Sequence, residues 1–258
     1  AQKSYQAVAG VDYNFKGFGN RPFRLSTEAY YKSMSSVDVY DIDNVKIRYA
    51  GNNNAKAYAT GFEARLFGEL VKDAESWFSI GIMQTKEDLD NDFYYQYKNA
   101  AGEIINAQSS DQVAVDSIKN NVGFVRRPTD RLITAGLYLE DYLTTNKNFK
   151  FHLNMLYGSN MSYNIPNSTK YRNALVIEPY IRVDAGFSAQ LLSEKSKRRS
   201  HSPFRSFQNI WASFEVVNVI DRRNTISFQL IKDFANNVYA LPNRLTPRLV
   251  NFKIVGRF

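Results

Sequence analysis

Cysteine is absent from the 258-residue chain, which excludes disulfide bonds and thiolate metal sites. No apolar run reaches the roughly 18 residues that a membrane-spanning helix needs, so we expect no transmembrane helix. The chain has two histidines, His152 and His201, which lie on different expected elements. We therefore expect neither a two-histidine metal site nor a Ser/His/Asp triad. A glycine-rich phosphate loop is also missing, and we expect neither a cofactor nor an enzymatic activity.

Aromatic residues and positive charge are both in excess. The 17 Tyr and 18 Phe contribute to an aromatic content of 14%, which is high for a soluble protein and typical of barrels with aromatic girdles. The mean hydropathy of -0.42 favours a soluble protein when taken alone. Alternation, however, dilutes the apolar signal of a membrane barrel to about half of each strand. The net charge of +8 is compatible with binding to nucleic acid or to anionic lipid head groups.

Nine segments alternate apolar and polar residues with a period of two, which favours strands over helices. In residues 181–191, for example, Val183 falls on one face and Arg182 on the other. The nine segments span residues 5–15, 23–32, 61–70, 77–85, 131–142, 149–158, 181–191, 210–216 and 248–258. At about 3.3 Å per residue and a tilt near 40°, ten or eleven residues cover roughly 25 Å, the height of an outer-membrane apolar band.

The polar faces of these segments carry full charges, which a solvated lumen tolerates. The outer face of a soluble sandwich would also tolerate them, whereas its interior would not. Salt bridges across a lumen explain the carboxylates better than a catalytic acid/base pair does. The side chains expected to line the lumen are Arg24, Glu28, Arg65, Glu140, Arg182, Asp184 and Lys253.

The lengths of the connections alternate along the chain. The links at 16–20, 71–76 and 144–148 are tight and the one at 192–207 is moderately long, whereas those at 33–60, 86–130, 159–180 and 217–247 are long. Short periplasmic turns alternating with long extracellular loops are typical of outer-membrane barrels. The sequence thus predicts an all-β fold, an antiparallel transmembrane β-barrel segment of about nine strands. An open sheet has two bare edges that lipid does not tolerate, so we expect strands from outside this chain to complete the barrel.

The last segment alternates up to the final residue of the chain. Its apolar face is formed by Val250, Phe252, Ile254 and Phe258, and we expect it to be the strand that closes the barrel at the C-terminus. No signal peptide is visible at Ala1, which we interpret as removal of a leader or as the start of a C-terminal portion.

Several stretches resemble one known family. They include Ala57-Tyr-Ala-Thr-Gly-Phe-Glu63, Arg127-Pro-Thr-Asp-Arg131, Phe214-Glu-Val-Val-Asn218 and, most specifically, the run from Tyr239 to Phe258. The chain resembles the C-terminal part of the β-barrel of a TonB-dependent outer-membrane receptor of the Bacteroidetes type. This resemblance implies a 22-stranded barrel with a plugged lumen, of which residues 1–258 are one part.

The resemblance also implies partners and a location. The plug domain and the first barrel strands would precede Ala1, and the TonB complex would act through the plug. The expected location is the bacterial cell outer membrane, in contact with its lipid. A surface lipoprotein lid occurs in the glycan-importing subgroup, but the ending of this chain departs from that subgroup.

Two polar stretches have competing interpretations. Asp88-Leu-Asp-Asn-Asp92 resembles the start of a calcium loop, but Phe93 stands where glycine is needed and Asn99 where glutamate is needed. A solvated acidic loop is preferred over an irregular calcium site, so no metal is expected. The basic run at 195–205 would suit nucleic acid, but no aromatic platform or groove-reading helix accompanies it. A periplasmic turn near anionic head groups or the plug is preferred, and no nucleic-acid partner is expected.

Three tyrosines follow the fourth segment. Tyr94, Tyr95 and Tyr97 lie on the long loop after it, where they would either stack on a ligand or join the outer aromatic girdle. The function predicted from the sequence is active import of a scarce nutrient, a metal chelate, glycan or peptide. The alternative is a structural barrel that serves as a docking subunit of a larger outer-membrane complex.

Overall fold

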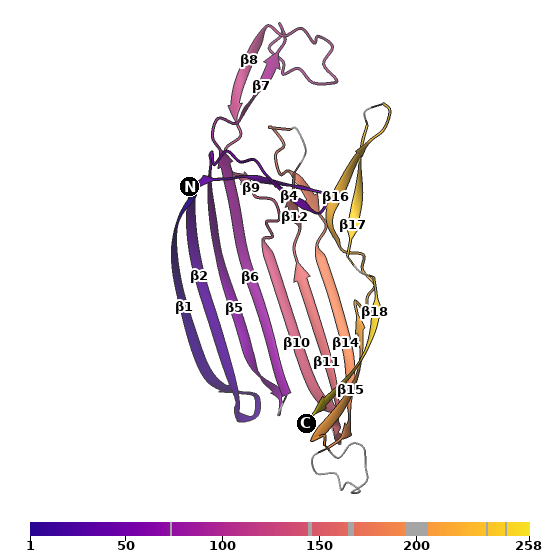
Figure 1. The fold of residues 1–258 in the computed structure, drawn as a ribbon. Helices are drawn as coiled ribbons and strands as arrows, with labels where there is room; N and C mark the ends of the chain where they lie inside the picture. The colour runs from indigo at the N-terminus through magenta and orange to yellow at the C-terminus, as the bar shows by residue number, and fades with distance from the viewer. Residues whose placement is uncertain (73, 144–145, 165–167, 194–205, 236, 246) are drawn as a thin grey trace.

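The computed structural model describes residues 1–258 except 73, 144–145, 165–167, 194–205, 236 and 246. Nine long strands form one antiparallel sheet with the spatial order β1-β2-β5-β6-β10-β11-β14-β15-β18 (Figure 1). Their bounds are Lys3–Gly17 (β1), Arg21–Val37 (β2), Ala55–Val71 (β5), Ala74–Leu89 (β6), Ile133–Leu143 (β10), Asn146–Gly158 (β11), Tyr180–Leu192 (β14), Asn209–Val217 (β15) and Leu249–Arg257 (β18). The nine strands expected from the alternation are confirmed, one for one.

The first four strands are longer than the alternation indicated. Strand β2, for instance, runs to Val37, five residues beyond its expected end at Lys32. The extension alternates poorly because the register shifts between Ser35 and Val37, and Val37 is buried there against Ala55 and Ala57. A short strand, β9 (Val125–Arg126), pairs with the end of β6 in this extended region. Among the described residues, no helix is long and apolar enough to cross a membrane, and the single 3-10 turn is Phe18–Asn20.

The four long connections contain hairpins that the sequence analysis treated as loops. These are β3 (Tyr40–Asp43) with β4 (Lys46–Tyr49), β7 (Phe93–Lys98) with β8 (Asp116–Asn121), β12 (Met161–Tyr163) with β13 (Leu175–Ile177), and β16 (Thr225–Lys232) with β17 (Val238–Arg244). All four lie at one end of the sheet, here called the long-loop end, and the short links lie at the opposite, short-turn end (Figure 1). The basic run at 195–205 and His201 lie outside the described residues.

The register of the sheet sorts apolar and polar side chains onto opposite faces. One cross-strand row consists of Phe151, Phe187, Phe214 and Phe252, each directly opposite the next. The adjacent row on the other face contains His152, Gly186, Glu215 and Asn251. A period of two in paired strands makes these rows continuous, so the sheet has one apolar face and one polar face.

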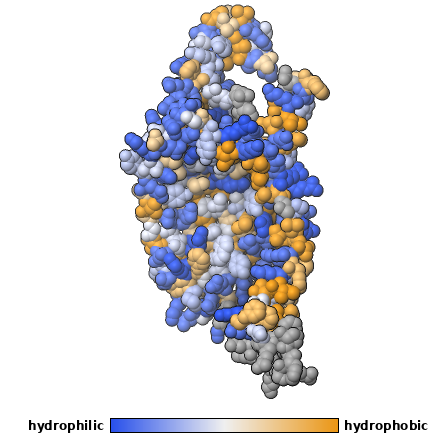
Figure 2. All heavy atoms as spheres, in the orientation of Figure 1, coloured by the Kyte–Doolittle hydropathy of each residue, from blue (hydrophilic) through white to orange (hydrophobic). Residues whose placement is uncertain are grey.

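The apolar face has no second layer over it within the described part of the chain. Phe252 remains 65% exposed and Phe214, on an inner strand, remains 49% exposed. In the view of Figure 2 the middle of the sheet is mostly hydrophilic or neutral, and apolar residues gather at the rim beside β16 to β18 and at the tip of β7 and β8. Within the described ranges, β1 pairs only with β2 and β18 only with β15, so both edges of this sheet are open.

Candidate functional site

The seven side chains expected to line a lumen share the polar face. The cross-strand pairs Ser26–Arg65 and Asn14–Arg24 fall on this face, as do Glu28–Glu63, Asn154–Asp184 and Ser213–Lys253. Glu140 is opposite His152, and Arg182 is opposite Leu156 in a row of the same face. The structure therefore brings the seven residues onto one surface, although they belong to five strands.

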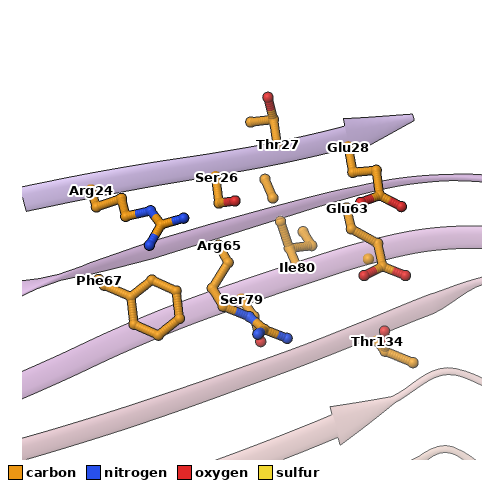
Figure 3. Close-up of a pocket in the computed structure, with 12 residues that line it drawn as sticks. Arg24, Ser26, Thr27, Glu28, Glu63, Arg65, Phe67, Ser79, Ile80 and Thr134 are labelled. Carbon is orange, nitrogen blue, oxygen red and sulfur yellow. The ribbon is translucent and has the colours of Figure 1, made fainter. Parts of the chain in front are cut away.

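A charged hollow of about 460 Å³ lies on the polar face over β2, β5, β6 and β10 (Figure 3). Glu28 and Glu63 are directly opposite each other at one end of it, Arg65 lies in the middle row, and Arg24 lies at the other end. Like charges that face each other directly across a strand pair are destabilising unless something neutralises them. In the described residues no cation lies within 4.0 Å of Glu28 or Glu63, so the hollow separates charge by sign and leaves it unneutralised.

Arg24 is the exception in this hollow, since its Nη2 lies 2.9 Å from Asp12 Oδ2. Both side chains are more than half exposed, so this ion pair adds little to stability. The contact of Arg65 within the described part of the chain is with a ring, its Cζ being 5.7 Å from the centroid of Phe67. Ser26 and Ser79 supply hydroxyl groups in the cross-strand row of Arg65, and Thr134 supplies one in the row of Glu28 and Glu63 (Figure 3).

A second hollow of about 380 Å³ lies toward β11, β15 and β18, and its polar side chains have more partners within the sheet. The ring of His152 lies over Gly186, where a Cβ would come within 2.1 Å of it, and its Nε2 is 3.4 Å from Glu215 Oε1. Trp77, Tyr138 and His152 form a stacked series, with ring centroids 6.3 and 6.5 Å apart. Because these rings stack on one another, the series stiffens the wall of the hollow.

Glu140 and Asp184 are both neutralised within the sheet. Lys150 Nζ lies 2.7 Å from Glu140 Oε1, and the hydroxyl of Tyr138 donates to the other carboxylate oxygen at 3.1 Å. Asp184 is nearly fully buried and accepts from Arg182 Nε at 2.7 Å, from the backbone N–H of Asn218 at 2.8 Å and from Asn154 at 3.2 Å. The charged side chains over β11 and β14 are therefore internally paired, in contrast to those over β2 and β5.

A buried ionic cluster lies at the long-loop end of the polar face. Glu87, 1% exposed at the end of β6, accepts from Arg127 Nε at 3.1 Å, Arg172 Nη1 at 3.0 Å and Asn173 Nδ2 at 3.2 Å. Arg172 also reaches Asp92 Oδ2 at 3.2 Å, just before β7. This cluster ties the connection that carries β12 and β13 to the base of the β7–β8 hairpin.

The carboxylates around Arg172 are partly dehydrated. Burial raises the pKa of Asp92, although the neighbouring guanidinium of Arg172 acts in the opposite direction. Burial likewise raises the pKa of Asp41 in β3, and Arg172 again opposes the rise. Arg172 thus pairs with Glu87 at the end of β6 and with Asp92 in the next connection, and it also acts electrostatically on Asp41 in the connection between β2 and β5.

Three of the long connections share a small hydrophobic core, which we call the loop cap. Tyr163 and Ile177 are almost fully buried, and Ile42 and Phe228 pack against them. The hydroxyl of Tyr163 lies 2.8 Å from the carbonyl oxygen of Ile42 and 2.9 Å from that of Phe228, so it is positioned to donate to either. The connections that carry β3, β12 and β16 are therefore joined over the same end of the sheet.

The three tyrosines of the expected binding loop do not form one surface. Tyr95 and Tyr97 lie with Phe93 on one face of the β7–β8 hairpin, with ring centroids 5.6 and 6.4 Å apart along the series. Tyr94 points to the other face, where Lys170 Nζ is 5.4 Å from its ring. The hairpin stands beyond the end of the sheet strands (Figure 1).

The sequence analysis did not single out Glu87 or Arg172. The alternation places Glu87 on the polar face, but its burial depends on Arg172, which is 85 residues away in sequence. Arg127 and Asp130 do lie in a stretch used for the family resemblance. Asp130 accepts from the backbone N–H of Thr85 at 2.8 Å and pairs with Arg126 at 2.8 Å, so this stretch anchors the end of β6.

No protein-family model and no curated protein matches this chain in sequence. Among solved structures, the ferric yersiniabactin uptake receptor FyuA from Yersinia pestis matches 100% of the chain with a TM-score of 0.60 at 15% identity. The ferric-catecholate import receptor Fiu from E. coli K12, in its closed form, matches 97% with a TM-score of 0.52 at 12% identity. The chain covers 30% of FyuA and 27% of Fiu, less than a third of either length. Its all-β, antiparallel fold is that of part of the β-barrel of these two uptake receptors.

Proposed function

We propose that residues 1–258 form the C-terminal part of the barrel of a TonB-dependent receptor of the Bacteroidetes type, in the bacterial outer membrane. The observation that carries the proposal is a single-layer sheet with an uncovered apolar face and a charged opposite face. In water such an apolar face would be unstable, whereas in a bilayer it meets hydrocarbon. The receptor would use energy delivered by TonB to import a scarce nutrient.

Aromatic rings on the apolar face support this orientation. Toward the long-loop end, Tyr31 and Tyr58 are stacked 6.4 Å apart and Phe124 lies 5.4 Å from Tyr58. At the short-turn end, Phe15 stacks between Tyr13 and Phe23, 5.6 Å from each. Interfacial belts of aromatic rings mark both borders of a barrel's apolar band. Between such borders, eight strand residues tilted by about 40° span roughly 20 Å.

The unneutralised hollow supports a partner on the polar face. Glu28 and Glu63 would receive cationic side chains of a plug domain, and Arg65 would receive an anionic or carbonyl group of it. The rest of the protein would supply that plug, the contact with TonB and the remaining strands of a 22-stranded barrel. In this proposal β18, with Val250, Phe252, Ile254 and Phe258, closes the barrel against the first strand.

Long-loop hairpins would capture the nutrient. The exposed face of β7 offers Tyr95 and Tyr97 to a planar or apolar ligand, with Tyr94 behind them. FyuA and Fiu are receptors for a ferric chelate and for ferric catecholates, so a metal chelate is the first of the three ligand classes to test. A glycan or a peptide is the next to test, with a surface lipoprotein as an additional partner for a glycan.

Two neighbouring residues of β18 test the membrane-facing role. Phe252→Arg puts a charge on the apolar face, at an expected cost of about 2–4 kcal/mol in hydrocarbon. Asn251→Arg puts the same charge on the polar face directly opposite Glu215, where we expect it to be tolerated. The readout is the amount of native protein in outer-membrane fractions that migrates faster on an unheated detergent gel. Equal amounts of the two variants would contradict the proposal.

A docking role is the second candidate. It is favoured by the β16–β17 hairpin, whose outer strand is exposed along its length and whose tip residue Phe234 is fully exposed. Uptake of a radiolabelled ferric chelate by cells, lost on deletion of the gene, would separate transport from docking. A strain without the gene that imports every tested nutrient normally but loses an envelope complex would favour docking.

A further inference from the structure

Three lysines stand together on the apolar side of the sheet, just above the aromatic rings of the long-loop end. They are Lys3 on β1, Lys56 on β5 and Lys86 on β6, and we call them the cationic corner. Their parity places them on the same face as Tyr58, because Tyr58 is directly opposite Lys86 and two positions from Lys56. Between the cationic corner and the rings of the short-turn end, β1, β2, β5 and β6 carry no charged residue on this face.

The spacing brings the three ammonium groups within reach of one small anion. Lys3 is opposite Ser35, and Ser35 is opposite Lys56, so the two lysines are two strands apart, about 10 Å. Lys86 is a diagonal neighbour of Lys56, at about 7–8 Å. Flexible four-carbon stems allow all three groups to converge, and Ser33 and Ser35 add hydroxyl donors between them.

The cationic corner lacks internal neutralisation among the described residues. None of the three lysines has a carboxylate within 4.0 Å, although Asp88 is directly opposite Lys56. Arg126, the cross-strand neighbour of Lys86, is already used by Asp130 at 2.8 Å. Counting Asp88 and Asp130 against Lys3, Lys56, Lys86 and Arg126, two positive charges remain at this border of the apolar face.

We propose that the cationic corner binds the phosphate of an anionic lipid head group in the leaflet at the long-loop end. The inference rests on the membrane-spanning role proposed above and adds a specific lipid to it. Lysine stems lie along apolar surface while their ammonium groups reach the head-group layer, and rings below them mark the border of that layer. A phosphorylated lipid matches this arrangement because its chains cover the apolar face while its phosphate meets the three lysines.

Retention of a phosphorylated lipid by the native protein tests the inference. The intact protein is purified in a neutral detergent, incubated with diphosphoryl lipid A or with the same lipid after phosphatase treatment, and examined by native mass spectrometry. We expect the phosphorylated form to be retained and the dephosphorylated form to be lost. The Lys56→Glu/Lys86→Glu variant should retain the phosphorylated form at least about tenfold less.

Lys32→Glu is the matched control. Lys32 lies on β2 near the same end of the sheet, but on the polar face, opposite Gln6 and Ala59. We expect this variant to retain the lipid as the unmodified protein does. Competition with millimolar inorganic phosphate separates the two sources of phosphate. Displacement of the lipid by free phosphate would overturn the proposal in favour of an ordinary anion site.

Heat-dependent gel migration of each variant separates failure of this inference from failure of the proposed function. If the proteins fold as barrels but the double variant retains the phosphorylated lipid unchanged, the lipid site is wrong and the receptor proposal stands. If the unmodified protein neither inserts into vesicles nor shows a heat-dependent shift, both proposals fall.

Discussion

Glu87 shows how a single buried charge can organise the long-loop end. Its carboxylate meets two guanidinium groups and one amide, and almost none of it reaches solvent. Forming such a cluster contributes little net stability, because dehydration of the charges offsets their attraction. Removing one member is costly, because the remaining charges stay buried without a partner.

Glu87→Gln should therefore loosen the cluster while the sheet remains intact. The amide keeps the shape but loses the charge that Arg127 and Arg172 require, at an expected local cost of about 3 kcal/mol. Hydrogen exchange around residues 90–98 and 168–174 should become faster, with exchange in the sheet strands unchanged. Glu178→Gln is the control, because Glu178 is 85% exposed and its ion pair with Arg222 is long, at 3.8 Å. Equal effects of the two substitutions would show that burial is not what matters at Glu87.

A close approach between a ring and a glycine fixes the short-turn end of β2 and β5. Phe23 is directly opposite Gly68, and a Cβ on Gly68 would lie 2.1 Å from the Phe23 ring. We expect Gly68→Val to destabilise the folded protein by about 1–3 kcal/mol, because the ring must leave its site. The measurement is the temperature at which the fast-migrating gel band disappears.

A double-mutant cycle identifies the cause of that loss. In a Phe23→Ala background the ring is gone, so Gly68→Val should cost clearly less than in the unmodified protein. An undiminished cost would point to the backbone of Gly68 instead of the ring.

At the scale of elements, the nine sheet strands were predictable because one face of each has to be apolar, which imposes a strict period of two. The loop hairpins were not, because no bilayer constrains them. Strand β7 reads Phe-Tyr-Tyr-Gln-Tyr-Lys, in which rings occupy both faces. The polar face of the sheet was predictable from the same period, whereas the partners of each charge were not. Glu140 and Asp184 have ion-pair partners within the sheet, whereas Glu28 has none among the described residues, although all three are carboxylates at polar-face positions of the alternation.

The β7–β8 hairpin supplies a test of ligand capture. Replacing both Tyr95 and Tyr97 by alanine removes the exposed rings, and we expect binding of the ferric chelate proposed as ligand to weaken by about tenfold or more. Tyr94→Ala, on the opposite face beside Lys170, should have a smaller effect. Binding to cells that carry each variant at equal surface level is the measurement. A larger loss for Tyr94→Ala would move the binding surface to the other side of the hairpin.

At the scale of the whole molecule, the two open edges dominate. The outer edge of β18 presents backbone N–H and C=O groups that hydrocarbon cannot satisfy, at several kcal/mol for each group left bare. In the proposed barrel, strands from the rest of the protein would therefore pair with it before or during insertion.

Phe258 should influence that step. Its ring lies 4.3 Å from that of Phe207, beyond the end of β18, and it is otherwise exposed. We expect Phe258→Ala to reduce the amount of assembled protein several-fold, because an interfacial aromatic contact at the end of the last strand is lost. Quantifying heat-modifiable protein in the outer membrane tests this, with Arg257→Ala as the adjacent control. Normal assembly of the Phe258→Ala variant would show that this residue is not needed for closing the barrel.

The unequal strand lengths affect which parts of the surface tolerate changes in sequence. Strands β1, β2, β5 and β6 have 15 to 17 residues, whereas β15 and β18 have 9 each. One side of the rim is thus built from continuous ladders, where an inserted residue would shift every side chain beyond it to the wrong face. Hairpins extend beyond both groups of strands, β7–β8 after β6 and β16–β17 between β15 and β18, and hairpins accept insertions and deletions without disturbing the wall. Variation that evades antibodies or phages would therefore accumulate on the hairpins, leaving the ladders of the long strands as the more durable target.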